Sequence, residues 1–164
     1  MVKAHHVGMA DIVVVTSPEM LITLGLGSCI GLVLYDQTAK VAGMAHIMLP
    51  DSRGASAKAL EKPGKFADTA VPTLIEMVCA KGAVRSRLKA KFAGGSQMFA
   101  LPGAETDFLA VGARNAKETA DLLKKAGIQV VNSDVGGNKG RTVEFSTVDW
   151  MLAVKILGKG KIEI

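Results

Sequence analysis

One cysteine and one histidine in this sequence form a pair that could carry out acyl transfer. Cys29 lies in the glycine-rich run LGLGSCIG, and His46 follows seventeen residues later in GMAHIMLP. A thiol and an imidazole supply a nucleophile and its base. Because the surrounding glycines allow a substrate to approach closely, we expect backbone N–H groups around Gly27 and Ser28 to bind the oxyanion of an intermediate.

The residues between the pair predict a β-hairpin that sets the distance between them. IGLVLY alternates as a strand, DQTA is a polar interruption, and an apolar strand follows. If Tyr35 pairs with Lys40, the cysteine lies directly opposite the histidine, with Cβ atoms about 4.5 to 5.5 Å apart. If Asp36 pairs with Val41, both stay on one face but the contact becomes diagonal. The intermediate register would separate them.

The same pair predicts a difference in reactivity between the two cysteines. An imidazolium beside Cys29 would lower the pKa of its thiol, so we expect thiolate character there near neutral pH. Cys79 lies in the helical apolar run LIEMVC, where a buried thiol behaves as a small hydrophobic side chain. Neither cysteine belongs to a Cys-x-x-Cys pair, so we expect no disulfide framework, no metal site and no cofactor.

Length and composition limit the classes of protein that fit. At 164 residues the chain is expected to form a single domain, residues 1–164. No window reaches the roughly 18 to 20 apolar residues of a membrane span and the N-terminus lacks a signal-peptide core, which predicts a cytoplasmic protein without membrane insertion. The net charge of +5 suits an acidic partner, whereas 4% aromatic residues are too few for nucleic-acid stacking.

The spacing of apolar residues predicts more strands than helices. One helix is expected over 66–81, with Pro72 as a kink or in its first turn, and a second is expected to be capped by Asn115 and to end at Gly127. Consecutive strands with few helices indicate an α+β fold with mainly antiparallel or mixed sheets. The predicted strands cover 11–16, 20–24, 30–35, 41–49, 89–93, 109–112, 128–131, 141–146 and 150–157.

A polar stretch, residues 51–65, follows the histidine segment and is long enough to be a mobile loop. Its basic side chains, Arg53 and Lys58 among them, can meet acidic groups that flank a substrate side chain. We therefore expect Arg53 and Lys58 to take part in substrate selection. A plain solvent-exposed connection fits the same pattern.

These segments together resemble the CheD family of chemoreceptor glutamine deamidases over nearly the whole chain. TLGLGSC resembles the family's nucleophile segment, GMAHIMLP its histidine segment and FAGGSQMF its glycine-rich strand end, and GARN and DVGGNKGR follow in the family's order. Many relatives carry Asn at the position of Ala45, a departure that leaves the reacting residues in place. The resemblance implies packed mixed or antiparallel β-sheets with helices on the outside, similar to a toxin-type cysteine deamidase.

The resemblance also implies roles for individual residues and for partners. Cys29 would be the nucleophile, His46 its base, and Thr23 the third member that orients the imidazole. The implied reaction converts specific receptor glutamine side chains to glutamate and releases ammonia through a cysteine thioester. The implied partners are the chemoreceptor cytoplasmic domain and a CheC-type response-regulator phosphatase.

Other functions fit parts of the sequence. A chemotaxis adaptor could bind receptor and phosphatase without catalysis, although a complete set of Thr23, Cys29 and His46 argues against docking alone. A general thiol amidase or protease would use the same chemistry on other substrates. A nucleophile-elbow hydrolase does not fit, because that fold needs a helix after the nucleophile and a late histidine, and no histidine follows His46.

Overall fold

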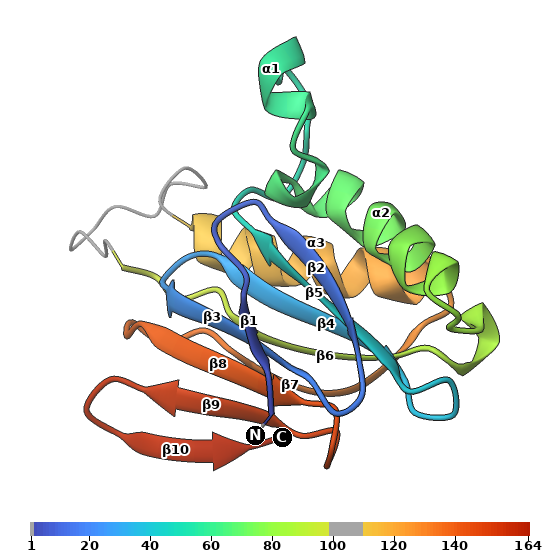
Figure 1. Cartoon of the computed structure of the whole chain (residues 1–164). Helices are drawn as coiled ribbons and strands as arrows, with labels where there is room; N and C mark the ends of the chain where they lie inside the picture. The colour runs from blue at the N-terminus through green and yellow to red at the C-terminus, as the bar shows by residue number, and fades with distance from the viewer. Residues whose placement is uncertain (1, 99–109) are drawn as a thin grey trace.

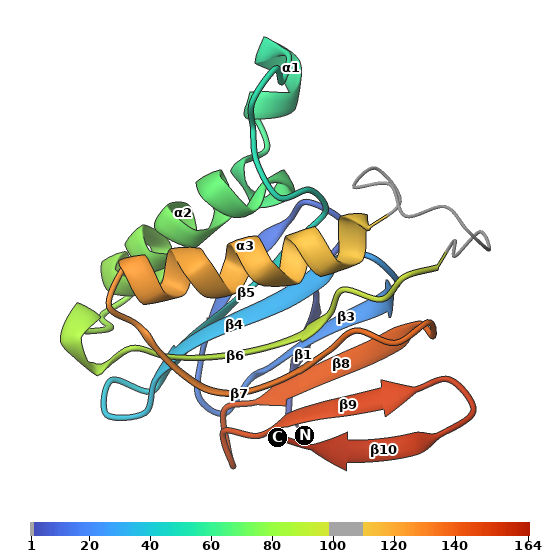
Figure 2. The ribbon, with the colours of Figure 1, turned by 180° about the vertical axis from the view of Figure 1, so that it is seen from behind.

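The computed structural model describes residues 2–98 and 110–164 as two packed β-sheets with two long helices on one side (Figure 1, Figure 2). Sheet A has the strand order β1-β3-β8-β9-β10, and sheet B has the order β2-β5-β4-β6-β7. The element bounds are β1 Ala4–His6, β2 Ile12–Thr16, β3 Met20–Leu26, β4 Ile30–Asp36, β5 Val41–Ile47, α1 Ala57–Leu60, η1 Pro63–Lys65, α2 Ala67–Ala80, η2 Arg85–Arg87, β6 Lys89–Gly94, α3 Val111–Lys125, β7 Gln129–Val135, β8 Arg141–Ser146, β9 Leu152–Ile156 and β10 Gly160–Glu163.

Sheet B is covered on both faces, which explains why every residue of β4 and β5 is buried. Leu32 and Leu34 of β4 pack with Leu74 of α2 in the core between sheet and helices. Val33, which points the other way, packs with Phe145 of sheet A in the core between the sheets. The predicted α+β class, with packed mixed sheets and helices outside, is confirmed.

Two registers of the β4–β5 hairpin would keep Cys29 and His46 on one face, and the structure has the one in which their contact is diagonal. Asp36 pairs with Val41, and Gly31 lies opposite His46. The alternative in which Cys29 lies directly opposite His46 is therefore wrong. Diagonal neighbours across an antiparallel pair lie about 7 to 8 Å apart between Cα atoms and remain within reach of long side chains.

The side chain of Asp36 explains this register. It is fully buried, and its Oδ1 accepts hydrogen bonds from the N–H groups of Thr38 and Ala39, so the turn closes directly after it. Burial disfavours the charged form, but hydrogen bonds from Arg87, Val84 and Ala39, together with the Arg87 charge, lower the pKa of Asp36 to about 2. The ionised carboxylate thus fixes the turn and, through it, the pairing of the two strands.

The predicted helices form with corrected starts. α2 begins at Ala67, so Pro72 lies inside the helix and not in its first turn. α3 begins at Val111, so the strand predicted over 109–112 is wrong for residues 110–112, and residue 109 lies outside the described part of the chain. Asn115 is inside α3 and does not cap it, whereas the predicted end of that helix at Gly127, with φ of +74°, is confirmed.

The chain ends hold two strands that sequence patterns did not predict. β1 pairs in parallel with β3, and β10 pairs antiparallel with β9 at the far edge of sheet A. The stretch 51–65, predicted to be a loop, contains the short helices α1 and η1. No helix within residues 2–98 and 110–164 is long and apolar enough to cross a membrane.

Candidate active site

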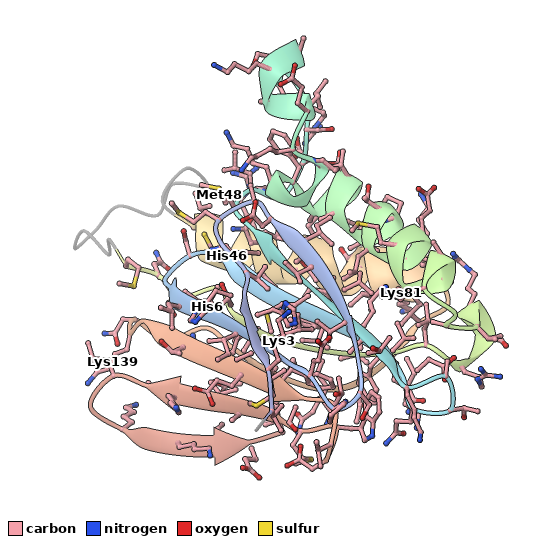
Figure 3. All side chains as sticks on the ribbon, viewed as in Figure 1. Lys3, His6, His46, Met48, Lys81 and Lys139 are labelled. Carbon is pink, nitrogen blue, oxygen red and sulfur yellow. The ribbon has the colours of Figure 1, made fainter. Side chains whose placement is uncertain are left out.

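Cys29 and His46 line one cavity of about 350 Å³ at the end of the sheets where β3 passes into β4. Cys29 directly precedes β4, and His46, labelled in Figure 3, lies near the end of β5. The remaining lining comes from the segment after β1 and from the end of β3: His6, Val7, Gly8, Met9, Leu24 and Gly25. The N-terminal segment therefore closes one side of the cavity.

A chain of hydrogen bonds fixes which nitrogen of His46 carries a proton. Thr23 Oγ1 lies 2.6 Å from the carbonyl oxygen of Val7 and 2.8 Å from His46 Nδ1. A threonine hydroxyl has one proton, and the carbonyl of Val7 can only accept it. Nδ1 must then donate its own proton to Thr23 Oγ1, which leaves the imidazole lone pair on Nε2. His46 Nε2 is buried and has no hydrogen-bond partner among the described residues, so it is available as a base.

The contact between Thr23 and His46 crosses from one sheet to the other. Thr23 lies on β3 of sheet A, whereas His46 lies on β5 of sheet B opposite Gly31. A Cβ atom at position 31 would lie 3.3 Å from Thr23 Cγ2 and 3.2 Å from Val143 Cγ2. Gly31 therefore provides the space in which the threonine reaches the imidazole. The structure brings Thr23 and His46 into contact, and the orienting role that the family resemblance implies for Thr23 stays a prediction.

We expect Thr23→Val to lower kcat/KM by about 10- to 100-fold, because it removes one buried hydrogen bond to a group that becomes charged during the reaction. Loss of the acceptor for Nδ1–H also disfavours the imidazolium, so the acid limb of the pH–rate profile should move to lower pH. Thr23→Ser keeps the hydroxyl and should retain most of the activity. An unchanged profile in Thr23→Val would contradict this role for the hydroxyl.

Burial favours the neutral forms of both reacting groups. It raises the pKa of the Cys29 thiol, and it lowers the pKa of His46 against the opposing effects of the Val7 carbonyl and the Asp11 charge. These directions are the opposite of those expected for a resting Cys29 thiolate beside an imidazolium. The arrangement suits general-base catalysis, in which Nε2 takes the thiol proton as the sulfur attacks.

The pH dependence of Cys29 alkylation should show that its thiol is neutral at rest. We expect the rate with iodoacetamide to rise through a midpoint above about pH 8.5, the ordinary value for a cysteine thiol, because burial raises the pKa. The measurement is a series of timed labelling reactions at increasing pH, with peptide mapping to separate Cys29 from Cys79. A midpoint near or below neutrality would show a resting thiolate and contradict the neutral pair.

The loop that carries Cys29 is held by its carbonyl groups. The carbonyl oxygen of Gly27 accepts a hydrogen bond from Ser96 N–H, and that of Cys29 accepts one from Gly95 N–H. A Cβ atom at Gly94 would overlap the Cys29 carbonyl oxygen, so only glycine allows this approach. Among the described residues, the N–H groups of Ser28 and Cys29 donate to no protein acceptor. They are therefore the candidates for binding an oxyanion.

Asn115 joins the cysteine segment to the histidine segment, a function that sequence reasoning missed. It is fully buried on α3, and its Nδ2 donates to the carbonyl oxygens of Ser28 and Met48, each at 2.9 Å. Ser28 precedes Cys29, and Met48 follows His46 by two residues. The GARN segment is the available signal in the sequence, but its Asn-x-x-Glu spacing predicts a helix cap.

We expect Asn115→Ala to lower kcat by about 10- to 100-fold, because the two segments lose their shared donor and the reacting atoms lose their alignment. Thr119→Val is the matched control, since Thr119 is also fully buried on α3 but has no hydrogen bond to either segment. Steady-state kinetics and thermal unfolding should be measured on both variants. Equal losses of activity and stability in both would make Asn115 a purely structural residue.

The predicted substrate-loop residues lie apart from the cavity. Arg53 follows β5, and its guanidinium Nη2 lies 3.0 Å from Asp51 Oδ2. Lys58 lies on α1, which stands away from the sheets (Figure 1). Neither residue lines the cavity that contains Cys29. Their contact with a substrate stays a prediction.

The fold and the cavity together are typical of a cysteine-dependent hydrolase, because one cavity is lined by a thiol and by an imidazole whose proton-accepting nitrogen is fixed. A family model described as "CheD chemotactic sensory transduction" matches residues 48–156. The chain belongs to this CheD family.

Relatives with assigned names match nearly the full chain. A protein of Caldanaerobacter subterraneus subsp. tengcongensis, named as a probable chemoreceptor glutamine deamidase CheD, is 49% identical over 158 residues, which is 96% of each chain. A protein of Clostridium novyi with the same name is 47% identical over 155 residues, 94% of each chain. A chemoreceptor glutamine deamidase CheD of Halalkalibacterium halodurans is 46% identical over 158 residues, 96% of each chain.

Proposed function

We propose that this protein is a chemoreceptor glutamine deamidase that converts receptor glutamine side chains to glutamate and releases ammonia. The observation that carries the proposal is the Thr23–His46 hydrogen bond, which leaves the imidazole lone pair on Nε2 in the cavity that Cys29 also lines. The names of the full-length relatives support the choice of substrate.

The first half of the reaction forms a thioester. As the sulfur of Cys29 attacks the side-chain amide carbon of glutamine, His46 Nε2 takes the thiol proton. The N–H groups of Ser28 and Cys29 stabilise the oxyanion of the tetrahedral intermediate. His46 then donates the proton from Nε2 to the amide nitrogen, the carbon–nitrogen bond breaks, and ammonia leaves with the acyl group bound to sulfur.

The second half returns the enzyme to its starting state. His46 Nε2 takes a proton from a water molecule, whose oxygen attacks the thioester carbon. The carbon–sulfur bond breaks, the sulfur regains a proton from His46, and the glutamate side chain is released. Thr23 accepts the Nδ1–H bond throughout and so keeps the charged imidazolium oriented in both halves.

We further propose that the protein acts in the cytoplasm, as one deamidase domain, and that a CheC-type phosphatase is a second partner beside the receptor. The resemblance of the nucleophile and histidine segments to the family supports these assignments. The two partners can be checked by co-purification of the receptor fragment and of the phosphatase with the Cys29→Ala variant.

Incubation with a purified receptor cytoplasmic fragment tests the proposed activity directly. We expect a mass gain of about 1 Da at each modified glutamine, with one ammonia released for each, because hydrolysis replaces an amide by a carboxylate. The inactive control is Cys29→Ala. Cleavage of the fragment backbone would indicate a protease, and tight binding without a change in mass would indicate an adaptor.

A further inference from the structure

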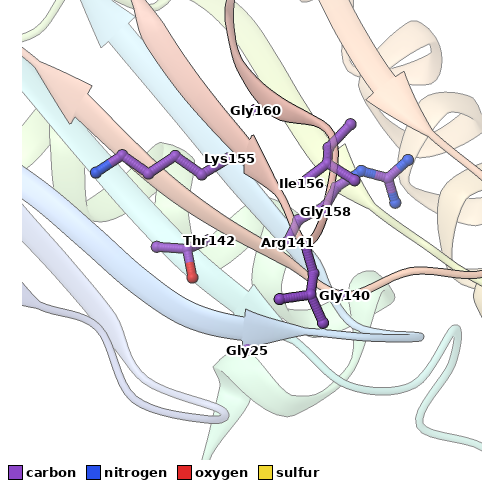
Figure 4. A pocket seen from close by; sticks show the side chains of 9 residues that line it. Gly25, Gly140, Arg141, Thr142, Lys155, Ile156, Gly158 and Gly160 are labelled. Carbon is purple, nitrogen blue, oxygen red and sulfur yellow. The ribbon is translucent and has the colours of Figure 1, made fainter.

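A second hollow lies beside the active-site cavity, and no step of the proposed reaction uses it. It has a volume of about 590 Å³ and lies where β3, β8 and β9 come together (Figure 4). Gly25 lines both this hollow and the cavity that contains Cys29. We call it the glycine trough, defined by Gly25, Gly140, Arg141, Thr142, Lys155, Ile156, Leu157, Gly158 and Gly160.

Four of the nine residues that line the glycine trough are glycines, so part of its wall is backbone without side chains. The pairing of β3 with β8 shifts between Thr23 and Leu26, and nothing lies within 4 Å of a Cβ position at Gly25. Apolar side chains are exposed nearby, with Leu157 at 77% and Leu24 at 58% exposure. Among the described elements, both long helices lie on the far side of sheet B (Figure 1, Figure 2), so a polypeptide can approach this end of sheet A.

Positive charge borders the glycine trough. Lys155, which lines it, forms an ion pair with Glu144 at 2.8 Å. Lys139 and Lys159 are exposed and form no ion pair with any described residue. Lys139 Nζ lies 3.6 Å from the Cβ position of Gly158, which places it over the trough. An acidic ligand can therefore gain contacts with two ammonium groups that have no ion-pair partner within residues 2–98 and 110–164.

We propose that the glycine trough binds an acidic segment of polypeptide next to the glutamine that reacts, with Lys139 and Lys159 contacting its carboxylates. The proposal rests on the proposed deamidase function and names the feature that the substrate must carry. Because Gly25 joins the two spaces, a segment in the trough can place a neighbouring side chain at Cys29. A glutamine without acidic neighbours would react poorly, which supplies the selectivity that the Cys–His pair lacks.

Charge reversal at the trough tests the proposal. The test variant is K139E/K159E, and the matched control is K40E/K81E, which carries the same change in net charge. Lys40 lies in the β4–β5 turn and Lys81 ends α2, both far from the Cys29 end of the sheets (Lys81 and Lys139 are labelled in Figure 3). Turnover is measured on a receptor fragment and on a short neutral peptide with one glutamine. Fragment binding is measured separately in the Cys29→Ala background.

We expect K139E/K159E to lower kcat/KM for the receptor fragment about 10-fold or more at low salt, mainly through KM, and to weaken fragment binding similarly. K139E/K159E should turn over the neutral peptide at a rate close to that of the wild type. K40E/K81E should turn over both the fragment and the neutral peptide at rates close to those of the wild type. High salt should remove the difference between the variants. Equal turnover and equal binding of the fragment by the two variants would overturn the proposal. Binding to anionic lipid vesicles is measured as well, and it would also overturn the proposal if it were as tight as binding to the fragment and were lost in K139E/K159E.

The binding measurement separates this proposal from the proposed function. If the wild type deamidates the fragment but reversal at the trough changes neither turnover nor binding, the trough proposal fails and the deamidase stands. If the fragment binds through the trough but no glutamine changes mass, the acidic binding site stands and the deamidase proposal fails.

Discussion

Cys29→Ala is expected to lower deamidation of a receptor fragment by at least about 10⁴-fold, because no other group in the cavity can form the thioester. The unfolding temperature and the affinity for the fragment should stay close to wild type. The loop is held through the backbone carbonyl of Cys29, which accepts from Gly95 N–H, so the substitution removes the sulfur and keeps this bond. Ammonia release and mass gain measure the activity, and thermal unfolding measures the fold.

Cys79→Ala is the control for that experiment. Cys79 is partly buried on α2 and packs against the core between α2 and sheet B, away from the cavity. We expect this variant to lose some stability and to keep its kcat. Deamidation by Cys29→Ala at the wild-type rate would exclude Cys29 as the nucleophile.

His46→Ala should lower kcat/KM by at least about 100-fold, since the variant loses the base for the thiol proton and the acid for the departing ammonia. Its pH profile should also change shape. In the wild type, burial lowers the pKa of His46, so the neutral base persists to below about pH 6.5, where the acid limb lies.

Without the imidazole, the residual rate should depend on ionisation of Cys29 alone and rise with pH through a midpoint above about 8.5. Steady-state rates over the range in which the protein stays folded measure both limbs. A His46→Ala profile that keeps the wild-type acid limb would show that another group titrates there, and a loss of only a few-fold would exclude His46 as the general base.

The local patterns of the chain were sufficient to predict most strands and to place Cys29 and His46 on the same hairpin, where both line one cavity. Apolar residues alternate along a strand because one face of the strand is buried, and this alternation can be read from a single segment. The choice between the two registers was not predictable in the same way. It depends on the Asp36 carboxylate, whose partners Val84 and Arg87 lie far along the chain.

Contacts between distant segments explain the features that the sequence did not reveal. Asn115 has a typical capping pattern, and only the folded chain shows that its amide binds Ser28 and Met48. The N-terminal strand β1 is short, and its pairing with β3 brings the Val7 carbonyl to Thr23. The direction in which the pKa of Cys29 is shifted could not be predicted from the sequence either, because it depends on burial of the thiol by surrounding segments.

The most direct test of the catalytic assignment is the intact mass of the enzyme after rapid acid quenching of its reaction with a glutamine peptide. A thioester on Cys29 predicts an adduct equal to the peptide mass less one ammonia, located by mapping to the peptide that contains Cys29. The adduct should be absent from Cys29→Ala and should be removed by hydroxylamine. Deamidation by the wild type with an adduct on another residue, or with undiminished turnover in Cys29→Ala, would contradict the account.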